Sequence, residues 1–77
     1  MFKAVILNPK RTIFEGDVKN VFLPGVEGEF EVMDLHKPLI SLLKGGNIIL
    51  NWEASVPIQK GVVMVLKNEL IAMVEEA

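Results

Sequence analysis

The sequence predicts an all-β protein, an antiparallel sandwich or barrel built from eight or more short strands. Apolar runs of strand length recur along the whole chain, and groups of turn-forming residues separate them. A helix has little room, because the run at residues 39–43 lies between Pro38 and the pair Gly45-Gly46. With 77 residues and no linker or internal repeat, the chain is expected to form one domain over residues 1–77.

Four strands are predicted in the first half of the chain, at residues 2–7, 12–14, 18–23 and 29–32. The breaks between them contain turn formers, at Asn8-Pro9, Glu15-Gly16-Asp17 and Pro24-Gly25. In the fourth strand, Phe30 and Val32 alternate with two glutamates, which is typical of a strand with one solvent-exposed face.

Five strands are predicted in the second half, at residues 39–43, 48–52, 55–59, 62–66 and 70–74. Turn formers again lie between several of them, at Lys44-Gly45-Gly46, Glu53-Ala54 and Lys67-Asn68-Glu69. The last of these breaks is expected to be a tight hairpin, in which Asn68 tolerates a left-handed backbone.

Composition argues against several classes of function. The chain has no cysteine, so it has no disulfide and no thiolate chemistry. Its net charge of −2 argues against a general nucleic-acid binder, which needs a basic surface. No apolar run approaches the roughly 20 residues that a membrane helix needs. Hydrophobic residues make up 51% of the chain, which indicates a partner surface unless it reflects the apolar atoms found on any protein surface.

The stretch FLPGVEGEFEVMDLHKPL, residues 22–39, concentrates glycine, proline, acidic residues and the only histidine. A phosphate-binding loop is disfavoured, because such a loop needs more glycine, a lysine among its glycines and a following helix, and the neighbouring glutamates repel phosphate. A metal or acid–base site is disfavoured because there is no second histidine. Ser41 and Ser55 have no recognisable triad setting. His36 is therefore expected to be a loop residue that is hydrogen-bonded to backbone.

Negative charge is segregated around the same stretch. Residues 15–35 contain six acidic residues and one lysine, a local charge of −5 in a chain whose total is −2. Such a segregated acidic face suits a basic partner protein and steers its association. The alternative interpretation is a solvated loop face without a partner.

Several short motifs share their order and spacing with one known family. Residues 23–30 read LPGVEGEF, and they are followed by His36, Pro38-Leu39 and the segment LKGG at 43–46. Asn8-Pro9 and the segment FEGDV at 14–18 precede them, and an apolar hairpin at 61–74 follows. Over almost the whole chain, these motifs resemble the epsilon subunit of F-type ATP synthases. The chain departs from the family pattern at Glu31, Asp34-Leu35, Lys37 and Lys60.

The resemblance implies a flattened antiparallel β-sandwich of about ten short strands, with no catalytic residue, cofactor or metal. It implies a non-catalytic rotor subunit of the central stalk, which links the gamma subunit to the c ring and couples ion-driven rotation to ATP synthesis. The implied location is the cytoplasmic face of the bacterial inner membrane, which the subunit reaches only through the complex. Neither nucleic acid nor a small-molecule substrate is an implied partner.

The resemblance also assigns two interfaces. The predicted c-ring interface comprises Pro24, Gly25, Val26, Glu27, Gly28 and Glu29. The predicted gamma interface comprises His36, Pro38, Leu39, Ser41 and Leu42, together with nearby apolar surface. Because the c-ring loop of the family carries a basic residue, Glu27 and Glu29 are expected to complement it. Most family members continue with a helical hairpin, and these 77 residues are expected to be the N-terminal sandwich without that hairpin.

A second hypothesis is a lipoyl- or biotinyl-type carrier domain, which is also a β-sandwich of about this size. Such domains carry a modified lysine at the tip of an exposed hairpin, and Lys37 would be the attachment site here. Pro38 follows this lysine directly and no hairpin symmetry surrounds it, so this hypothesis ranks second.

Overall fold

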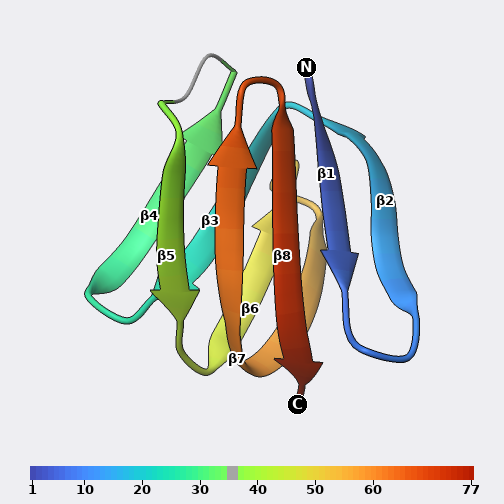
Figure 1. The fold of residues 1–77 in the computed structure, drawn as a ribbon, viewed down its shortest axis with the longest axis vertical. Coiled ribbons are helices and arrows are strands. Elements are labelled where there is room, and N and C mark those ends of the chain that lie inside the picture. Colours follow the sequence, from blue (N-terminus) through green and yellow to red (C-terminus); the bar gives the residue numbers. More distant parts are fainter. Residues whose placement is uncertain (35–36) are drawn as a thin grey trace.

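A computed structural model describes residues 1–34 and 37–77 of the chain. In this part of the chain, the backbone forms eight strands and no helix (Figure 1). The strands are β1 (Phe2–Leu7), β2 (Thr12–Val18), β3 (Asn20–Gly25), β4 (Gly28–Met33), β5 (Leu39–Leu43), β6 (Gly46–Leu50), β7 (Ala54–Leu66) and β8 (Glu69–Glu76). Among the described residues there is consequently no helix that could cross a membrane.

The strands form a single hydrogen-bonded sheet that folds over on itself. Its order is β2-β1-β8-β7-β5-β3-β4, and β6 pairs with both β3 and β7. β1 and β8 run parallel to each other, whereas the other pairs are antiparallel. Figure 1 shows this parallel pair side by side, with the two chain termini at opposite ends of the molecule.

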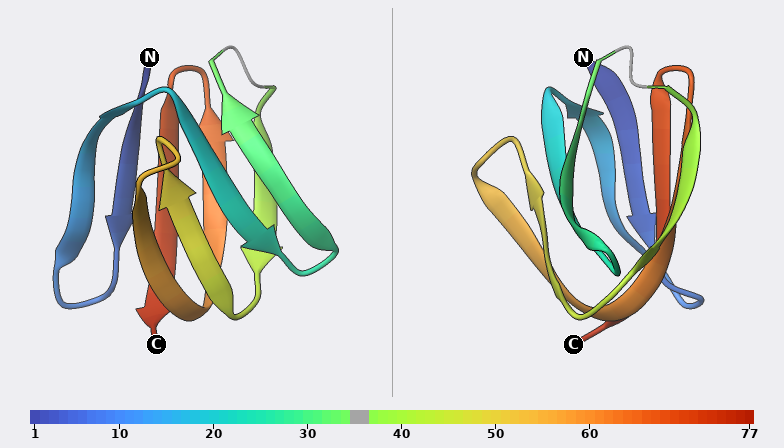
Figure 2. Two further views of the ribbon diagram at one scale, coloured as in Figure 1. Left: turned by 180° about the vertical axis from the view of Figure 1, so that it is seen from behind. Right: turned by 90° about the vertical axis from the view of Figure 1, so that its left-hand side faces the viewer.

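The long strand β7 divides the sheet into two layers. Residues 54–58 of its 13 residues pair with β6, and residues 61–65 pair with β5. Between Ile58 and Lys60 the register against β8 shifts, and a bulge of this kind bends a strand and increases its twist. The right-hand view of Figure 2 shows β7 passing from one layer to the other. The first layer contains β2, β1, β8, the second part of β7 and β5, and the second layer contains the first part of β7, β6, β3 and β4.

The hydrophobic core lies between the two layers. Inward-facing positions alternate with outward-facing ones, as in β1, where Phe2, Ala4 and Ile6 are buried. Burial of one large aliphatic or aromatic side chain stabilises the fold by about 1.5–3 kcal/mol relative to leaving it exposed. Every strand contributes to this core, whose buried residues are Phe2, Ala4, Ile6, Val18, Val21, Leu23, Val32, Leu43, Ile48, Leu50, Ile58, Val63, Val65, Leu70, Ala72 and Val74.

The predicted fold class is confirmed, although some strands begin and end elsewhere. The expected break at Glu15-Gly16-Asp17 lies inside β2, because these residues continue the pairing with β1. The expected break at Pro24-Gly25 lies inside β3, where both residues pair with β4. Segments 55–59 and 62–66 form the single strand β7. The described residues therefore form eight strands rather than about ten, since β7 serves both layers.

The predicted hairpin between β7 and β8 is confirmed, but its left-handed residue is Lys67 and not Asn68. Lys67 has a φ of 49°, and Asn68 is not among the described residues with positive φ. The Asn68 carbonyl accepts a hydrogen bond of 2.9 Å from the backbone N–H of Lys3 in β1. The neighbouring strand therefore constrains Asn68, and the left-handed conformation falls on Lys67.

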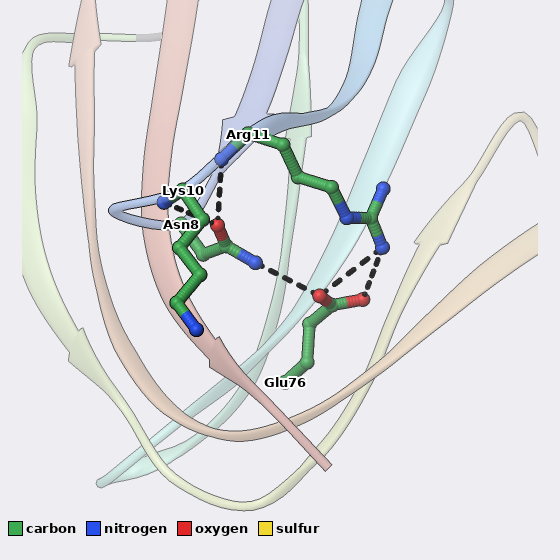
Figure 3. Close-up of polar contacts among 4 residues, drawn as sticks. All are labelled: Asn8, Lys10, Arg11 and Glu76. Atoms are coloured by element: carbon green, nitrogen blue, oxygen red, sulfur yellow. Dashed lines mark hydrogen bonds and ion pairs between the residues drawn. The ribbon is translucent and has the colours of Figure 1, made fainter.

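A polar cluster holds the end of β8 against the turn between β1 and β2 (Figure 3). The Asn8 side chain accepts hydrogen bonds from the backbone N–H groups of Lys10 and Arg11, both at 2.8 Å. Its amide nitrogen donates to Glu76 Oε1 at 2.8 Å. Arg11 Nη2 donates to both carboxylate oxygens of Glu76, at 3.2 and 3.0 Å. Asn8 thus shapes the turn and also contacts β8.

Gly61 lies at a close approach between β7 and β8. A Cβ at this position would lie 2.7 Å from the Met73 carbonyl oxygen and 2.9 Å from Val74 Cγ1. At Gly16, the nearest atom to such a Cβ is Phe14 Cζ at 3.4 Å, which is an ordinary contact. The two glycines therefore differ in the space around them.

Replacing Gly61 with alanine should lower the free energy of unfolding by about 1–3 kcal/mol, because the new Cβ forces the two strands apart. The matched control Gly16→Ala should change the free energy of unfolding by less than about 0.5 kcal/mol. Urea unfolding followed by far-UV circular dichroism measures both values. Equal effects of the two substitutions would contradict a packing constraint at Gly61.

Replacing Asn8 with alanine should destabilise the fold by about 1–2 kcal/mol, because it removes three hydrogen bonds, two of them within a turn. Arg11→Gln should cost only about 0–1 kcal/mol, since the Arg11–Glu76 ion pair is exposed to solvent. The same urea experiment ranks the two variants. A larger cost for Arg11→Gln would mean that the ion pair, and not the turn, holds the end of β8.

Candidate docking surfaces

The acidic turn, residues 26–29, joins β3 to β4. Gly25 pairs with Gly28, so Val26 and Glu27 form a two-residue connection. Gly28 has a φ of 135°, a conformation that residues with side chains rarely adopt. A Cβ on Gly25 would lie 2.7 Å from the Gly28 carbonyl oxygen, so this tight hairpin depends on glycine at both positions.

The acidic turn is tied by its backbone to β5. The Val26 N–H donates to the Leu42 carbonyl oxygen at 3.1 Å, and the Lys44 N–H donates to the Pro24 carbonyl oxygen at 2.8 Å. Gly25 also pairs with Leu43. These contacts hold the turn in a fixed position relative to the first layer.

The six residues of the predicted c-ring interface differ in exposure. Val26 is 51% exposed, and Glu27, Gly28 and Glu29 are also exposed. Pro24 and Gly25 are buried in β3. These two residues position the turn and present no exposed side chain, so a partner would meet only residues 26–29.

The residues of the predicted gamma interface also separate into two groups. Pro38 is exposed and Leu42 is 61% exposed, whereas Leu39 and Ser41 alternate with Leu42 along β5 and are half-buried. Leu39 packs against the core. His36 lies outside the described residues. Ile40 was not among the predicted interface residues, although it is 74% exposed and lies on the same side of β5 as Leu42.

Ile40 and Leu42 belong to a larger surface, the apolar face, on the outer side of the first layer. Cross-strand pairing aligns its side chains in two rows over β5, β7, β8 and β1. Neighbouring strands are about 4.8 Å apart, so each row crosses roughly 15 Å of surface. The first row is Ile40, Met64, Ile71 and Val5, and the second row is Leu42, Val62, Met73 and Leu7.

The sequence contains a signal for the apolar face. Segments 62–66 and 70–74 are apolar at every position, although they lie in adjacent antiparallel strands. An antiparallel strand with one solvent-exposed face alternates apolar and polar residues, and uninterrupted apolar runs indicate that both faces are covered. Val63, Val65, Leu70, Ala72 and Val74 fill the core, and the remaining residues of the two segments face outward.

A groove of about 830 Å³ connects the apolar face to the acidic turn. Its lining includes Val26 from the turn and Leu42, Val62 and Met73 from the apolar face. Lys10 and Glu75 also line it, so charged side chains border an apolar floor. Interfaces between proteins commonly combine an apolar centre with a polar rim.

Charged residues also border the apolar face on the side of β1 and β2. Lys3 forms an ion pair of 3.1 Å with Glu15, and both side chains are about half exposed. The hydrogen bond to Glu15, together with the negative charge of this carboxylate, raises the pKa of Lys3.

Lys37, the residue on which the carrier hypothesis depends, lies in the connection between β4 and β5. These two strands do not pair with each other, because β3 lies between them in the sheet. Lys37 is exposed, but it is not at the tip of a hairpin. The fold therefore gives the carrier hypothesis no support.

In the part of the chain that the structure describes, no group of acidic, histidine or cysteine residues could hold a metal ion.

The whole chain matches a family described as "ATP synthase, Delta/Epsilon chain, beta-sandwich domain", over residues 1–77. A protein named ATP synthase epsilon chain from Nitratiruptor is 44% identical, with 97% of this chain and 61% of the relative covered. The protein of that name from Sulfurovum is 40% identical, with 100% of this chain and 63% of the relative covered. This chain thus spans less than two thirds of the length of both relatives. The protein of the same name from Chlorobium limicola is 35% identical, with 97% and 90% covered.

Solved structures share the fold at low sequence identity. One chain comes from the structure titled "Cryo-EM structure of Tetrahymena thermophila mitochondrial ATP synthase - central stalk/cring". It has a TM-score of 0.83 and 13% identity, with 96% of this chain and 63% of that chain covered. A chain of the Euglena gracilis mitochondrial ATP synthase has a TM-score of 0.84 and 18% identity, with 95% and 49% covered.

The family match extends over every residue, and relatives above 30% identity cover nearly the whole chain. The two-layered fold agrees with this match. The chain belongs to the ATP synthase delta/epsilon family, as its beta-sandwich domain.

Proposed function

We propose that this chain is a non-catalytic central-stalk subunit of an ATP synthase, in which it links the gamma subunit to the c ring. The family match and the names of the relatives support this role. So does the resemblance of the fold to a chain from a structure of a central stalk and c ring. In a bacterium, such a subunit would lie at the cytoplasmic face of the inner membrane and would contact that membrane only through the complex.

The observation that carries the proposal is the exposed apolar face. Ile40 and Leu42 of β5 are 74% and 61% exposed, and Met73 of β8 is 44% exposed, with β7 between these two strands. Contiguous apolar patches on a soluble domain mark sites of protein–protein contact. In the proposed function, the gamma subunit covers this face, with Pro38 and Leu42 at one edge of the contact.

The acidic turn would face the c ring. Glu27 and Glu29 are exposed, and no lysine or arginine forms an ion pair with them in residues 1–34 and 37–77. Acidic side chains on a turn complement a basic loop and favour its encounter.

The link between the two surfaces suits a rotor subunit that couples ion-driven rotation to ATP synthesis. Transmission of torque requires that the contact with gamma and the contact with the ring move together. The hydrogen bond from Val26 to Leu42 joins a residue of the acidic turn directly to a residue of the apolar face. The bond from Lys44 to Pro24 supports this junction from the base of the turn.

Leu42→Asp should weaken binding of the gamma subunit about tenfold or more, because it places a charge against an apolar contact. Leu42 is 61% exposed in the isolated chain, so the fold should survive the change. The control Met33→Asp adds the same charge at a side chain that is 55% exposed on the other layer. Calorimetric titration with the gamma subunit of the same organism measures the affinity of both variants for gamma. Equal binding of the two variants would place gamma elsewhere.

Reversal of both turn charges, Glu27→Lys with Glu29→Lys, should leave gamma binding unchanged and weaken the coupling of proton pumping to ATP hydrolysis. Like charges placed against each other at an interface cost several kcal/mol, whereas loss of one exposed ion pair costs only about 0–1 kcal/mol. The defect should shrink at high salt, since exposed charges are screened over roughly 8–10 Å at ordinary ionic strength. The measurement is the coupling of proton pumping to ATP hydrolysis in reconstituted ATP synthase, at low and at high salt. Normal coupling of the double variant at low salt would show that the turn does not contact the ring.

A further inference from the structure

The second layer carries an exposed aromatic pair that neither proposed interface uses. Trp52, in the turn between β6 and β7, stacks edge-on against Phe22 of β3, with ring centroids 4.5 Å apart and an interplanar angle of 66°. The indole is only partly covered by this contact, because Trp52 is 69% exposed. Phe22 faces outward on β3, and it pairs with Ile49 of β6 on one side and Glu31 of β4 on the other.

The backbone holds Trp52 in a conformation that is unfavourable for a bulky residue. Asn51 and Trp52 have φ values of 54° and 61°. Asn or Gly occupies such positions more readily, and strained non-glycine residues cluster at functional sites. The turn is anchored to the rest of the layer, since the Asn51 N–H donates to the Asn20 carbonyl oxygen at 3.0 Å. Asn51 Oδ1 in turn accepts from the Lys19 N–H at 2.7 Å.

Three glutamates neighbour the aromatic pair in the sheet or along the chain. Glu31 lies directly across from Phe22, Glu29 follows on the same side of β4, and Glu53 adjoins Trp52 in the turn. In the described part of the chain, no lysine or arginine forms an ion pair with these three glutamates. The outward positions of the paired strands β3 and β4 carry no basic residue. The aromatic face, defined as Phe22, Glu31, Ile49 and Trp52, is therefore apolar at its centre and negative at its edge.

Hydrogen bonding at the aromatic face is incomplete. Asn20 is 5% exposed and its Nδ2 donates to Glu31 Oε2 at 2.8 Å, which fixes the carboxylate beside the aromatic pair. Among the described residues, Asn20 Oδ1 is a buried acceptor without a donor. Buried polar atoms in native structures almost always have a hydrogen-bond partner. The outward positions of β3 and β4 thus carry negative charge and no basic residue, and among the described residues the neighbouring Asn20 Oδ1 has no hydrogen-bond donor.

We propose that the aromatic face binds an arginine side chain on a basic, exposed segment of a partner protein. A guanidinium stacks on an indole face and at the same time donates hydrogen bonds to a carboxylate, which a lysine ammonium does less well. Side chains directly opposite each other on paired strands have Cβ atoms about 4.5–5.5 Å apart, so a single arginine can reach from Trp52 across Phe22 to Glu31. A nucleic acid does not fit, because the three glutamates repel phosphate. A second copy of this chain fits poorly, because a symmetric contact would bring both sets of glutamates together.

Trp52 itself reports on binding, because it is the only tryptophan and the chain contains no tyrosine. The probe is an acetylated and amidated peptide, Gly-Arg-Gly-Arg-Gly, titrated into the chain at low salt while Trp emission is recorded. A saturable change in emission is expected with this peptide. A peptide with citrulline in place of arginine, which keeps the shape and removes the charge, should bind about tenfold more weakly or worse. The lysine peptide should bind about twofold to fivefold more weakly than the arginine peptide.

Three variants locate the site. Glu31→Gln should weaken the arginine peptide about threefold or more, since it removes one charge but keeps an acceptor for Asn20. Glu69→Gln, the same change at the hairpin between β7 and β8, should have no effect. Glu27→Gln, in the acidic turn, should also have little effect, so that failure of this proposal is distinguishable from failure of the proposed ring contact.

A fourth variant, Trp52→Asn, should abolish the interaction, as followed by calorimetry. Asparagine tolerates positive φ, so the turn should stay folded, and far-UV circular dichroism confirms that it does. Equal binding of the citrulline and arginine peptides, or equal weakening by Glu27→Gln and Glu31→Gln, would overturn the proposal. A concentration-dependent dimer that Trp52→Asn converts to monomer would also overturn it, because the face would then be a contact between two copies of the chain.

Discussion

The bend in β7 is the constraint on which the rest of the structure depends. One strand pairs with β6 in the second layer and with β5 and β8 in the first, so it belongs to both sides of the core. The bulge between Ile58 and Lys60 provides the change in direction. Gly61 follows at once, and its missing side chain lets β8 approach closely. Without this bend the sheet would have one face open to solvent, and its buried aliphatic residues would have no opposing layer.

Closure of the sandwich has a direct consequence for binding. The core is filled by alternate residues, so the remaining residues of each strand must face outward. In β7 and β8 those residues are also apolar, which leaves the apolar face exposed. The same closure brings β3 beside β5, through the pairing of Gly25 with Leu43. This junction sets the acidic turn next to the apolar face and forms the groove between them.

The two layers present different chemistry to their surroundings. The first layer presents aliphatic and methionine side chains in two rows, with charged residues such as Lys3 and Glu15 at the border. The second layer presents Trp52 and Phe22 beside glutamates. The proposed role in a stalk requires contacts on more than one side, and surfaces of different chemistry would discriminate between the partners in such contacts. A chain of this length has a small core and leaves a large share of its surface exposed, so both layers have surface available for contacts.

The sequence by itself determined the fold class and most strand positions. Period-two alternation and turn residues report local structure, so the limits of β1 and β5 agree with those predicted. It also determined the family, because the motifs keep their order and spacing over the chain. The predicted strand limits are wrong where long-range pairing overrides local turn propensity. Gly16 and Pro24, for example, lie inside strands.

The candidate surfaces needed the tertiary structure. Sequence reasoning identified Glu27 and Leu42, but it also included Pro24 and Gly25, which are buried, and it omitted Ile40. The exposure of a side chain depends on whether it faces the opposing layer. When both faces of a strand are apolar, the sequence pattern does not show which face is the inner one. The stacking of Trp52 on Phe22 joins residues 30 positions apart, and the pairing of Phe22 with Glu31 adds the charge. Only the folded sheet brings these three side chains together, because each comes from a different segment of the chain.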